Sequence, residues 1–441
     1  MTSGRYLFLL LVCSFAVGIL QTCFFEDSFP LSASDYLLML PLYVAALLFL
    51  GVFFFLRRGL LALFALCAFF FTLGCIRTLL PSFALQSSFG MEWGRAGADA
   101  LSTVLHRARL SPDTTALLEA MLLGRRDGLS DYVLDLYRQS GASHILALSG
   151  LHLSVLFGVF NYGLLRVLHR RWRYFVGLLG ILFMWGYAFL TGFPISLCRA
   201  TLMLSLLVIA QMRLVGNEGW HTLGLAAMVL LLLNPLTLFD VGFQLSFAAV
   251  AGLLLFYPPL MAIGLPKRRF LRRLWQLFVV ALSAQLGVFP LLLHYFHRFS
   301  LVGLFFSPFY ALIATLFLFV ALLLLILSGI GAAFLLRPLL EGLAFIQHGL
   351  MAFSLRLSWG GGESVWLLPG SIEHVHFSWG SVLLLYVALL CLLPSLHALQ
   401  WLRDCPPLHR RALFFRTWPY LLAFLLLTLS AFLMPFIYLC V

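Results

Sequence analysis

Charge is scarce in this sequence. Only 10% of its 441 residues are Asp, Glu, Lys or Arg, whereas a soluble globular protein carries about 25%. Hydrophobic residues make up 63% and the mean hydropathy is +1.04. About 20 mostly apolar residues suffice to cross a bilayer. This composition excludes an ordinary soluble domain and predicts an all-α, polytopic integral membrane protein.

Acidic residues and paired cysteines are also few. The 16 acidic residues stand against 28 basic ones, which gives a net charge of +12. Because basic residues collect in the cytoplasmic loops of membrane proteins, this charge does not by itself indicate a nucleic-acid partner. The eight cysteines contain no C-x-x-C pair. No zinc ribbon or disulfide framework is implied, and we expect neither a metal nor a cofactor.

Long apolar runs are abundant and predict about 11–13 transmembrane helices. The runs lie near residues 6–25, 37–56, 59–76, 143–166, 174–191, 196–214, 221–239, 242–263, 274–293, 301–335, 338–357, 378–397 and 418–440. The run 301–335 is too long for a single crossing and contains Pro308. We therefore expect a short half-helix there, followed by a full one.

Basic residues indicate the orientation of the chain. They cluster near 57–58, 166–173, 266–273 and 403–416. With thirteen crossings and a cytoplasmic N-terminus, all four clusters fall on the cytoplasmic side, as the positive-inside rule requires. The C-terminus then lies outside.

The loop from Arg77 to Gly141 is the one long polar connection and falls outside in this topology. Residues 97–110 have apolar positions at helical spacing and are predicted to lie flat on the membrane. Ser111 precedes Pro112 and Ser130 opens a second amphipathic segment, as N-caps do. Gly141 is expected to end that second helix.

These features divide the chain into four predicted parts. Residues 1–80 hold the N-terminal membrane helices and 81–142 the external amphipathic loop. Residues 143–335 form a central core and 336–441 the C-terminal membrane helices.

Polar side chains interrupt the apolar runs of the central core. On a helix His144, Ser149 and His152 fall within an arc of roughly 140°, so they face protein or water rather than lipid. Later runs contain Arg199, Asp240, Gln244 and Gln285. A buried arginine needs an acceptor, and the candidates are Asp240 inside the protein or a phosphate from outside.

Other interpretations of these residues remain open. Isolated polar groups in membrane helices commonly form interhelical hydrogen bonds. Ser149 and His152, three residues apart, also suit a serine–histidine hydrolase of the membrane. His294 with His297, and His374 with His376, resemble metal ligands but have no third ligand nearby, which favours solvated loop residues.

Four linked segments carry a family resemblance. They are "SGASHILALSGLHLSVL", "LTGFPISLCRATLMLSL", "NPLTLFDVGFQLSFAAVAGLLL" and "AQLGVFPLLLHYFHRFSLVGL". In this order, over roughly residues 120–335, they resemble the competence domain of the ComEC family, the inner-membrane channel of bacterial DNA uptake. Members of that family often add an oligonucleotide-binding fold and a metallo-β-lactamase-like nuclease domain. This sequence has neither pattern, so we expect a channel-only member.

The resemblance implies passage of single-stranded DNA across the bacterial inner membrane in natural transformation. We expect no catalysis by the chain, because its sequence contains no ligand set for a metallo-nuclease and no nucleophile–base–orienter trio. Its implied partners are single-stranded DNA, membrane lipid, competence-machinery proteins, a nuclease acting in trans and a second copy of the chain. His144, Ser149, His152, Arg199, Asp240, Gln244 and Gln285 are the predicted pore-lining or DNA-contacting residues. A transporter of a small anionic solute, with Arg199 as the anion site, is the alternative from another class.

Overall fold

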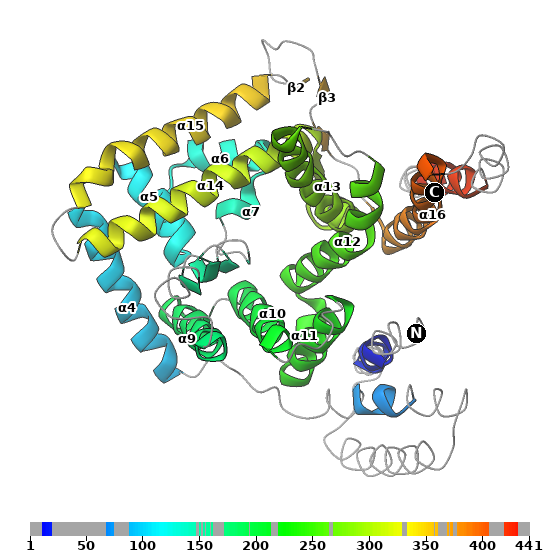
Figure 1. Cartoon of the computed structure of the whole chain (residues 1–441), viewed down its shortest axis with the longest axis horizontal. Helices are drawn as coiled ribbons and strands as arrows, with labels where there is room; N and C mark the ends of the chain where they lie inside the picture. The colour runs from blue at the N-terminus through cyan, green and yellow to red at the C-terminus, as the bar shows by residue number, and fades with distance from the viewer. Residues whose placement is uncertain are drawn as a thin grey trace. The chain divides into compact units, whose positions relative to one another are not determined.

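The structure is a computed structural model. It describes residues 11–19, 68–74, 88–146, 150, 153–154, 156–158, 160–161, 172–193, 195–212, 219–263, 268–328, 333–356, 358–359, 368–369, 371–373, 377–404 and 419–430. Helices account for nearly all of these residues (Figure 1), which confirms the predicted all-α fold of a membrane protein. The chain divides into two units, Met1–Gly94 with Gly163–Gln244, and Arg95–Tyr162 with Leu245–Val441.

Besides the helical stretches 11–19 and 68–74, the described residues of the first unit include three longer apolar helices and a 3₁₀ segment. These are α9 (Arg173–Leu190), α10 (Ile195–Met212), α11 (Gly219–Leu233) and η2 (Pro235–Phe239). Helix α10 packs against both α9 and α11. Gly192, at a φ of 77°, lets the chain leave α9, and the Phe193 N–H donates to the Ala188 carbonyl at 2.8 Å. This is the αL ending that glycine favours.

The second unit contains most of the remaining elements. They are α4 (Ser88–Arg107), α5 (Pro112–Leu123), α6 (Asp131–Gln139), α7 (Ser143–Leu146), α12 (Val241–Ile263), α13 (Arg269–Phe296), α14 (Leu301–Ser328), η3 (Ala333–Leu336), α15 (Arg337–Arg356) and α16 (Trp379–Asp404). The first turns of α4 and α12 belong to the first unit. Two minimal ladders join β1 (Arg298–Ser300) antiparallel to β4 (Ser371–Glu373) and β2 (Ser358–Trp359) parallel to β3 (Leu368–Pro369). Arg298 lies opposite Glu373 in the first ladder.

Capping residues determine where the short helices of the 81–142 segment begin and end. The Ser111 hydroxyl accepts from the Thr114 N–H, with Pro112 in the first turn of α5. The Ser130 hydroxyl accepts from the Val133 N–H at the start of α6. Gly141 has a φ of 72° just after α6. All three predicted helix signals are confirmed.

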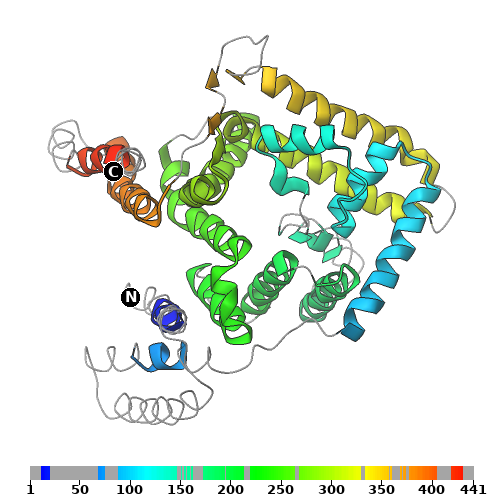
Figure 2. The same cartoon turned by 180° about the vertical axis from the view of Figure 1, so that it is seen from behind.

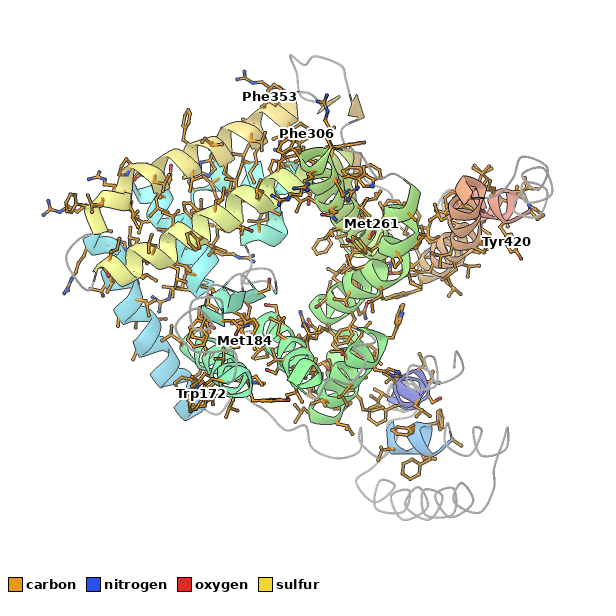
Figure 3. All side chains as sticks on the ribbon, viewed as in Figure 1. Trp172, Met184, Met261, Phe306, Phe353 and Tyr420 are labelled. Atoms are coloured by element: carbon orange, nitrogen blue, oxygen red, sulfur yellow. The ribbon has the colours of Figure 1, made fainter. Side chains whose placement is uncertain are left out.

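The main hydrophobic core of the second unit lies among α4, α5, α6, α14 and α15. Helices α14 and α15 run side by side (Figures 1 and 2). Phe306 of α14 and Phe353 of α15 meet edge to face, with ring centroids 6.5 Å apart (Figure 3). Leu117 and Leu118 of α5 are fully buried in this core.

The surface helix predicted at residues 97–110 has a different role. Its apolar positions Ala98 and Leu105 are buried in the same core, and Leu101 packs against it. An apolar stripe that is covered by protein is not available to a lipid surface. The apolar stripe that was expected to face lipid thus packs on protein, and the placement of the segment at the membrane surface stays a prediction.

Four described helices are long and apolar enough to cross a membrane. Their apolar windows are Val241–Ala262, Arg269–Phe296, Gly303–Leu325 and Trp379–Leu396, and shorter apolar helices occupy Tyr174–Leu190, Ser196–Ile209, Gly219–Leu233 and Pro419–Ser430. Helix α15, predicted as a crossing at 338–357, is not among them, because it carries Glu341, Gln347 and His348. The run 37–56, and much of 6–25, 59–76 and 143–166, lies outside the described residues. The thirteen-crossing count therefore stays a prediction.

Two predicted boundaries are wrong. Residues 301–328 form one helix with Pro308 inside it, not a half-helix followed by a full one. A proline near a helix start removes one backbone hydrogen bond, and packing against α15 maintains the helix around it. The run 221–239 is split, because Asn234 and Pro235 end α11 and begin η2.

Candidate functional site

The polar corner of the first unit lies where α11 gives way to η2 and then to α12. The Asn234 N–H still donates to the Leu230 carbonyl at 2.9 Å, so Asn234 closes α11. Its side-chain Oδ1 accepts from the Leu236 N–H at 3.0 Å and thereby caps η2. Proline at the next position has no N–H to leave unpaired. The pair Asn234 and Pro235 thus ends α11 and begins η2.

Asp240 lies between the end of η2 and the start of α12. Its Oδ2 accepts from the Phe243 N–H at 3.0 Å, and its carbonyl accepts from the Gln244 N–H at 3.1 Å. These are the two bonds of an N-cap residue, here opening α12. A carboxylate is favoured at this position because it faces the positive end of the helix dipole.

Arg199 reaches the same carboxylate from α10. Its Nη1 donates to Asp240 Oδ2 at 2.8 Å, while the arginine side chain is 4% exposed and the aspartate 37%. The internal acceptor predicted for Arg199 is therefore the one observed. The pair ties α10 to the start of α12 across 41 residues of sequence.

Gly242 provides the room that this ion pair needs. A Cβ added at Gly242 would lie 2.8 Å from Arg199 Nη2 and 3.3 Å from Asp240 Oδ2. Any side chain here would require the guanidinium to shift. Sequence reasoning missed Gly242, although "FDVG" places it two residues after the aspartate.

One donor of the arginine is left over. The Arg199 Nε is buried and makes no hydrogen bond. Gln244 makes no bond to it, and the Gln244 Nε2 donates to the Leu238 carbonyl at 2.9 Å. The Gln244 side chain therefore stabilises η2 from the first turn of α12.

The other predicted site residues are described only in part. Gln285 lies half-buried in α13 of the second unit. His144 belongs to α7 by its backbone, but its side chain lies outside the described residues, as do Ser149 and His152. The structure thus brings together Arg199, Asp240 and Gln244, whereas the pore-lining role of the remaining residues stays a prediction.

The histidines considered as metal ligands have other neighbours. His294 lies inside α13, where its Nδ1 is 2.5 Å from the Phe377 carbonyl and its ring centroid 4.3 Å from that of Trp379. The interpretation of His294 as a solvated loop residue is therefore wrong. The described part of the chain contains no group of three or more His, Cys, Asp or Glu residues that could hold a metal ion. His374 and His376 lie outside it.

The chain is similar in sequence to known proteins. A family model described as Competence protein matches residues 121–398, well over half of the chain. The chain is 36% identical over 194 residues to ComE operon protein 3 of Bacillus subtilis, 31% over 262 residues to Recombination protein 2 of Haemophilus influenzae, and 31% over 179 residues to Competence protein ComA of Neisseria gonorrhoeae. No solved structure matches the chain.

Each match covers only part of this chain and only part of the relative. They cover 44%, 55% and 38% of this chain, and 24%, 33% and 24% of the respective relatives. The matched part is thus a third or less of each relative's length. The polar corner lies inside the segment that the family model covers.

Proposed function

We propose, on the premise that this chain belongs to the competence protein family, that it conducts single-stranded DNA across the bacterial inner membrane during natural transformation. The observation that carries the proposal is the family match over residues 121–398. One of the relatives is named Competence protein ComA. The uptake role is assigned to this chain by analogy with its family.

We propose further that the ion pair positions the conducting helices. Arg199 is 4% exposed and donates to Asp240, so it is poorly placed to meet a phosphate directly. A buried pair of this kind fixes which elements stay together. It would hold α10 against the start of α12 while other polar groups meet the DNA. His144, Ser149, His152 and Gln285 remain the proposed lining residues.

The path should contact the DNA backbone and should not read the bases. Uptake of arbitrary DNA requires sequence tolerance, and phosphate contacts carry no sequence information. Histidine, serine and glutamine side chains all offer donors to phosphate oxygens. The proposed placement is multi-pass in the inner membrane, with a cytoplasmic N-terminus and an external C-terminus. Competence-machinery proteins, a nuclease in trans and a second copy of the chain are the proposed partners.

A deletion strain tests the function directly. Cells lacking this chain should bind labelled duplex DNA at their surface as before but accumulate no internalised label and yield no transformants. A plasmid copy of the chain should restore both readouts. Normal transformation in the deletion strain would disprove the proposal. Loss of surface binding as well would show that the chain acts before the inner membrane, which also contradicts it.

We propose that the chain itself does not hydrolyse DNA or esters. A serine–histidine hydrolase would need Ser149 as nucleophile with His152 as its base. We expect a fluorophosphonate probe to leave the purified chain unlabelled. Labelling that disappears in Ser149→Ala would overturn this expectation and favour the enzyme alternative.

A further inference from the structure

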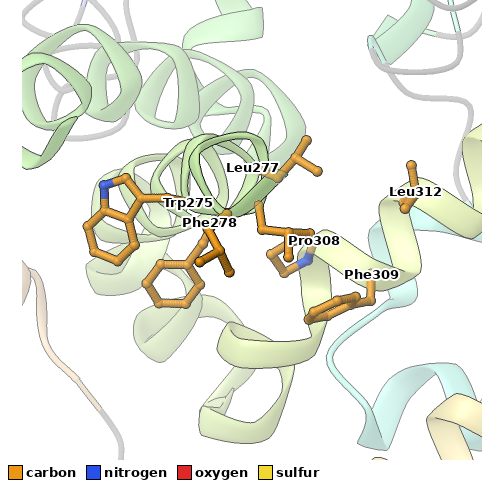
Figure 4. Close-up of a pocket in the computed structure, with 8 residues that line it drawn as sticks. Trp275, Leu277, Phe278, Pro308, Phe309 and Leu312 are labelled. Carbon is orange, nitrogen blue, oxygen red and sulfur yellow. The ribbon is translucent and has the colours of Figure 1, made fainter. Parts of the chain in front are cut away.

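An apolar groove lies between α13 and α14 in the second unit (Figure 4). Its volume is about 350 Å³, and its lining includes Leu271, Trp275, Leu277 and Phe278 of α13 with Pro308 and Leu312 of α14. Leu277 and Leu312 are 43% and 44% exposed, so the groove is open along its side. Both helices are among those apolar enough to cross a membrane. A groove of this chemistry suits a hydrocarbon chain.

Four arginines stand at one end of this groove. Arg268, Arg269, Arg272 and Arg273 are all exposed at the start of α13. The first turn of α13 contains no acidic residue, and no carboxylate of the described residues pairs with these arginines. The helix dipole adds further positive potential at this end. The groove therefore opens beside an uncompensated positive charge.

Helical spacing separates one of the four arginines from the other three. Residues three or four apart are neighbours on a helix surface. Arg268 therefore adjoins Leu271, Arg272 adjoins Trp275 and Arg273 adjoins Leu277, all of which line the groove. Arg269 adjoins none of the lining residues. The other three arginines are therefore better placed than Arg269 to hold a headgroup beside the groove.

We propose that this groove binds one anionic phospholipid. An acyl chain would lie between α13 and α14, and the lipid phosphate would be held by the arginines that adjoin lining residues, Arg268, Arg272 and Arg273. The charge complementarity selects an anionic lipid, and the apolar lining selects a molecule with a long hydrocarbon chain. A general basic surface would attract anionic lipid equally on all sides of α13, whereas this site uses the arginines beside the groove and not Arg269. The proposal does not depend on DNA transport.

Trp275 makes the site measurable in the full-length protein. The chain should be purified into vesicles that contain a small fraction of brominated-chain phosphatidylglycerol, or of phosphatidylcholine with the same chains. The bromines quench tryptophan fluorescence on contact. The chain has ten tryptophans, so the Trp275 contribution is the difference between the wild type and Trp275→Phe. The wild type should show saturable quenching at Trp275 that favours phosphatidylglycerol.

Two matched single variants test the assignment of the headgroup. Each arginine near an anionic surface contributes roughly a fivefold change in binding. Arg272→Gln should therefore reduce the preference for phosphatidylglycerol by roughly fivefold. Arg269→Gln removes the same charge from a position that adjoins no lining residue and should retain most of the preference. Equal loss in both variants would show a general basic surface and overturn the site.

The groove itself needs a separate pair of variants. Leu312→Phe narrows the groove, whereas Leu316→Phe enlarges an equally exposed leucine one turn further along α14 that does not line it. Only Leu312→Phe should weaken quenching at Trp275. Equal quenching of Trp275 by the two brominated lipids, taken as the same difference between the wild type and Trp275→Phe, would overturn the proposal, and this outcome does not depend on how the arginine and leucine variants fold.

Discussion

At the scale of single residues, Arg199 and Asp240 depend on each other. Removing one member of a buried ion pair typically costs about 3–5 kcal/mol, because the other charge is left unpaired, whereas removing both is often nearly neutral. Asp240 is 37% exposed, so we expect values at or below the lower end of that range. This asymmetry separates a positioning role from a direct contact with DNA.

Arg199→Ala should therefore reduce DNA uptake severely and lower the apparent melting temperature in detergent. The double variant with Asp240→Ala should recover much of both readouts, since no unpaired carboxylate remains. Arg199→Lys should be intermediate, because the charge is kept but the planar guanidinium is lost. A double variant that is as stable as the wild type yet still takes up no DNA would show that Arg199 does more than hold Asp240.

At single residues, the sequence predicted one contact of this site and missed another. Asp240 was predicted as the internal acceptor of Arg199, because a charge inside an apolar segment needs a partner of opposite sign. The bond from Gln244 to the Leu238 carbonyl was not foreseen. Its cause is the 3₁₀ turn that Asn234 and Pro235 impose, and helical periodicity carries no information about such a turn.

At the scale of elements, Glu341 of α15 joins two helices. Its carboxylate accepts from the Ser111 N–H at 2.5 Å, the Ser111 hydroxyl at 2.8 Å and the Thr114 hydroxyl at 2.7 Å. Burial alone would raise the pKa of Glu341, but these hydrogen bonds, together with the charge of Arg337, outweigh it and hold the pKa below its ordinary value. The ionised form of Glu341 therefore stabilises the packing of α5 on α15.

A depressed carboxyl pKa fixes the sign of the pH dependence. The stabilisation is fully present above the ordinary pKa of glutamate and is lost as the pH falls through the lowered folded-state value. Glu341→Gln should thus destabilise the protein by about 1–2 kcal/mol near neutral pH and by progressively less in acid. Thermal unfolding of both proteins in detergent from pH 7 to pH 3 measures this. A difference that grows on acidification would contradict it.

Helices α12 and α13 cross at two glycines. A Cβ at Gly287 would lie 2.1 Å from the Ala248 carbonyl oxygen, and one at Gly252 would lie 2.6 Å from that of Ser283. Backbone cannot yield as a side chain can, so Gly287→Ala should destabilise by roughly 1–3 kcal/mol. Gly349 of α15 has nothing within 4 Å, and Gly349→Ala should be neutral or slightly stabilising. Similar melting temperatures for the two variants would disprove the close crossing.

Element types were largely predictable, while their surroundings were not. Helices α9, α10 and α12 lie within about two residues of their apolar runs, and Ser111 and Ser130 cap where expected. The burial of α5 was missed because its apolar residues surround the helix. Such a pattern marks a buried helix but does not name the helices that bury it. That information lies in long-range packing against α14 and α15.

At the scale of the whole molecule, composition alone decided the membrane class, because 10% charge and 63% apolar content leave no soluble alternative. Composition does not determine the number of membrane crossings. Helix α15 has the length of a crossing but carries Glu341, Gln347 and His348 among its apolar residues. Length and periodicity predict a helix there, while the polar side chains decide whether lipid or protein surrounds it.

The central claim is that this chain conducts single-stranded DNA. Its most direct test is entry of DNA into vesicles that contain the purified chain and enclose a dye that fluoresces on binding single strands. Oligonucleotides of unrelated base sequence should enter at similar rates, and a duplex of the same length should not. Empty vesicles should stay dark throughout. No entry of any single strand into vesicles that hold a folded chain, or equal entry of duplex, would contradict the account.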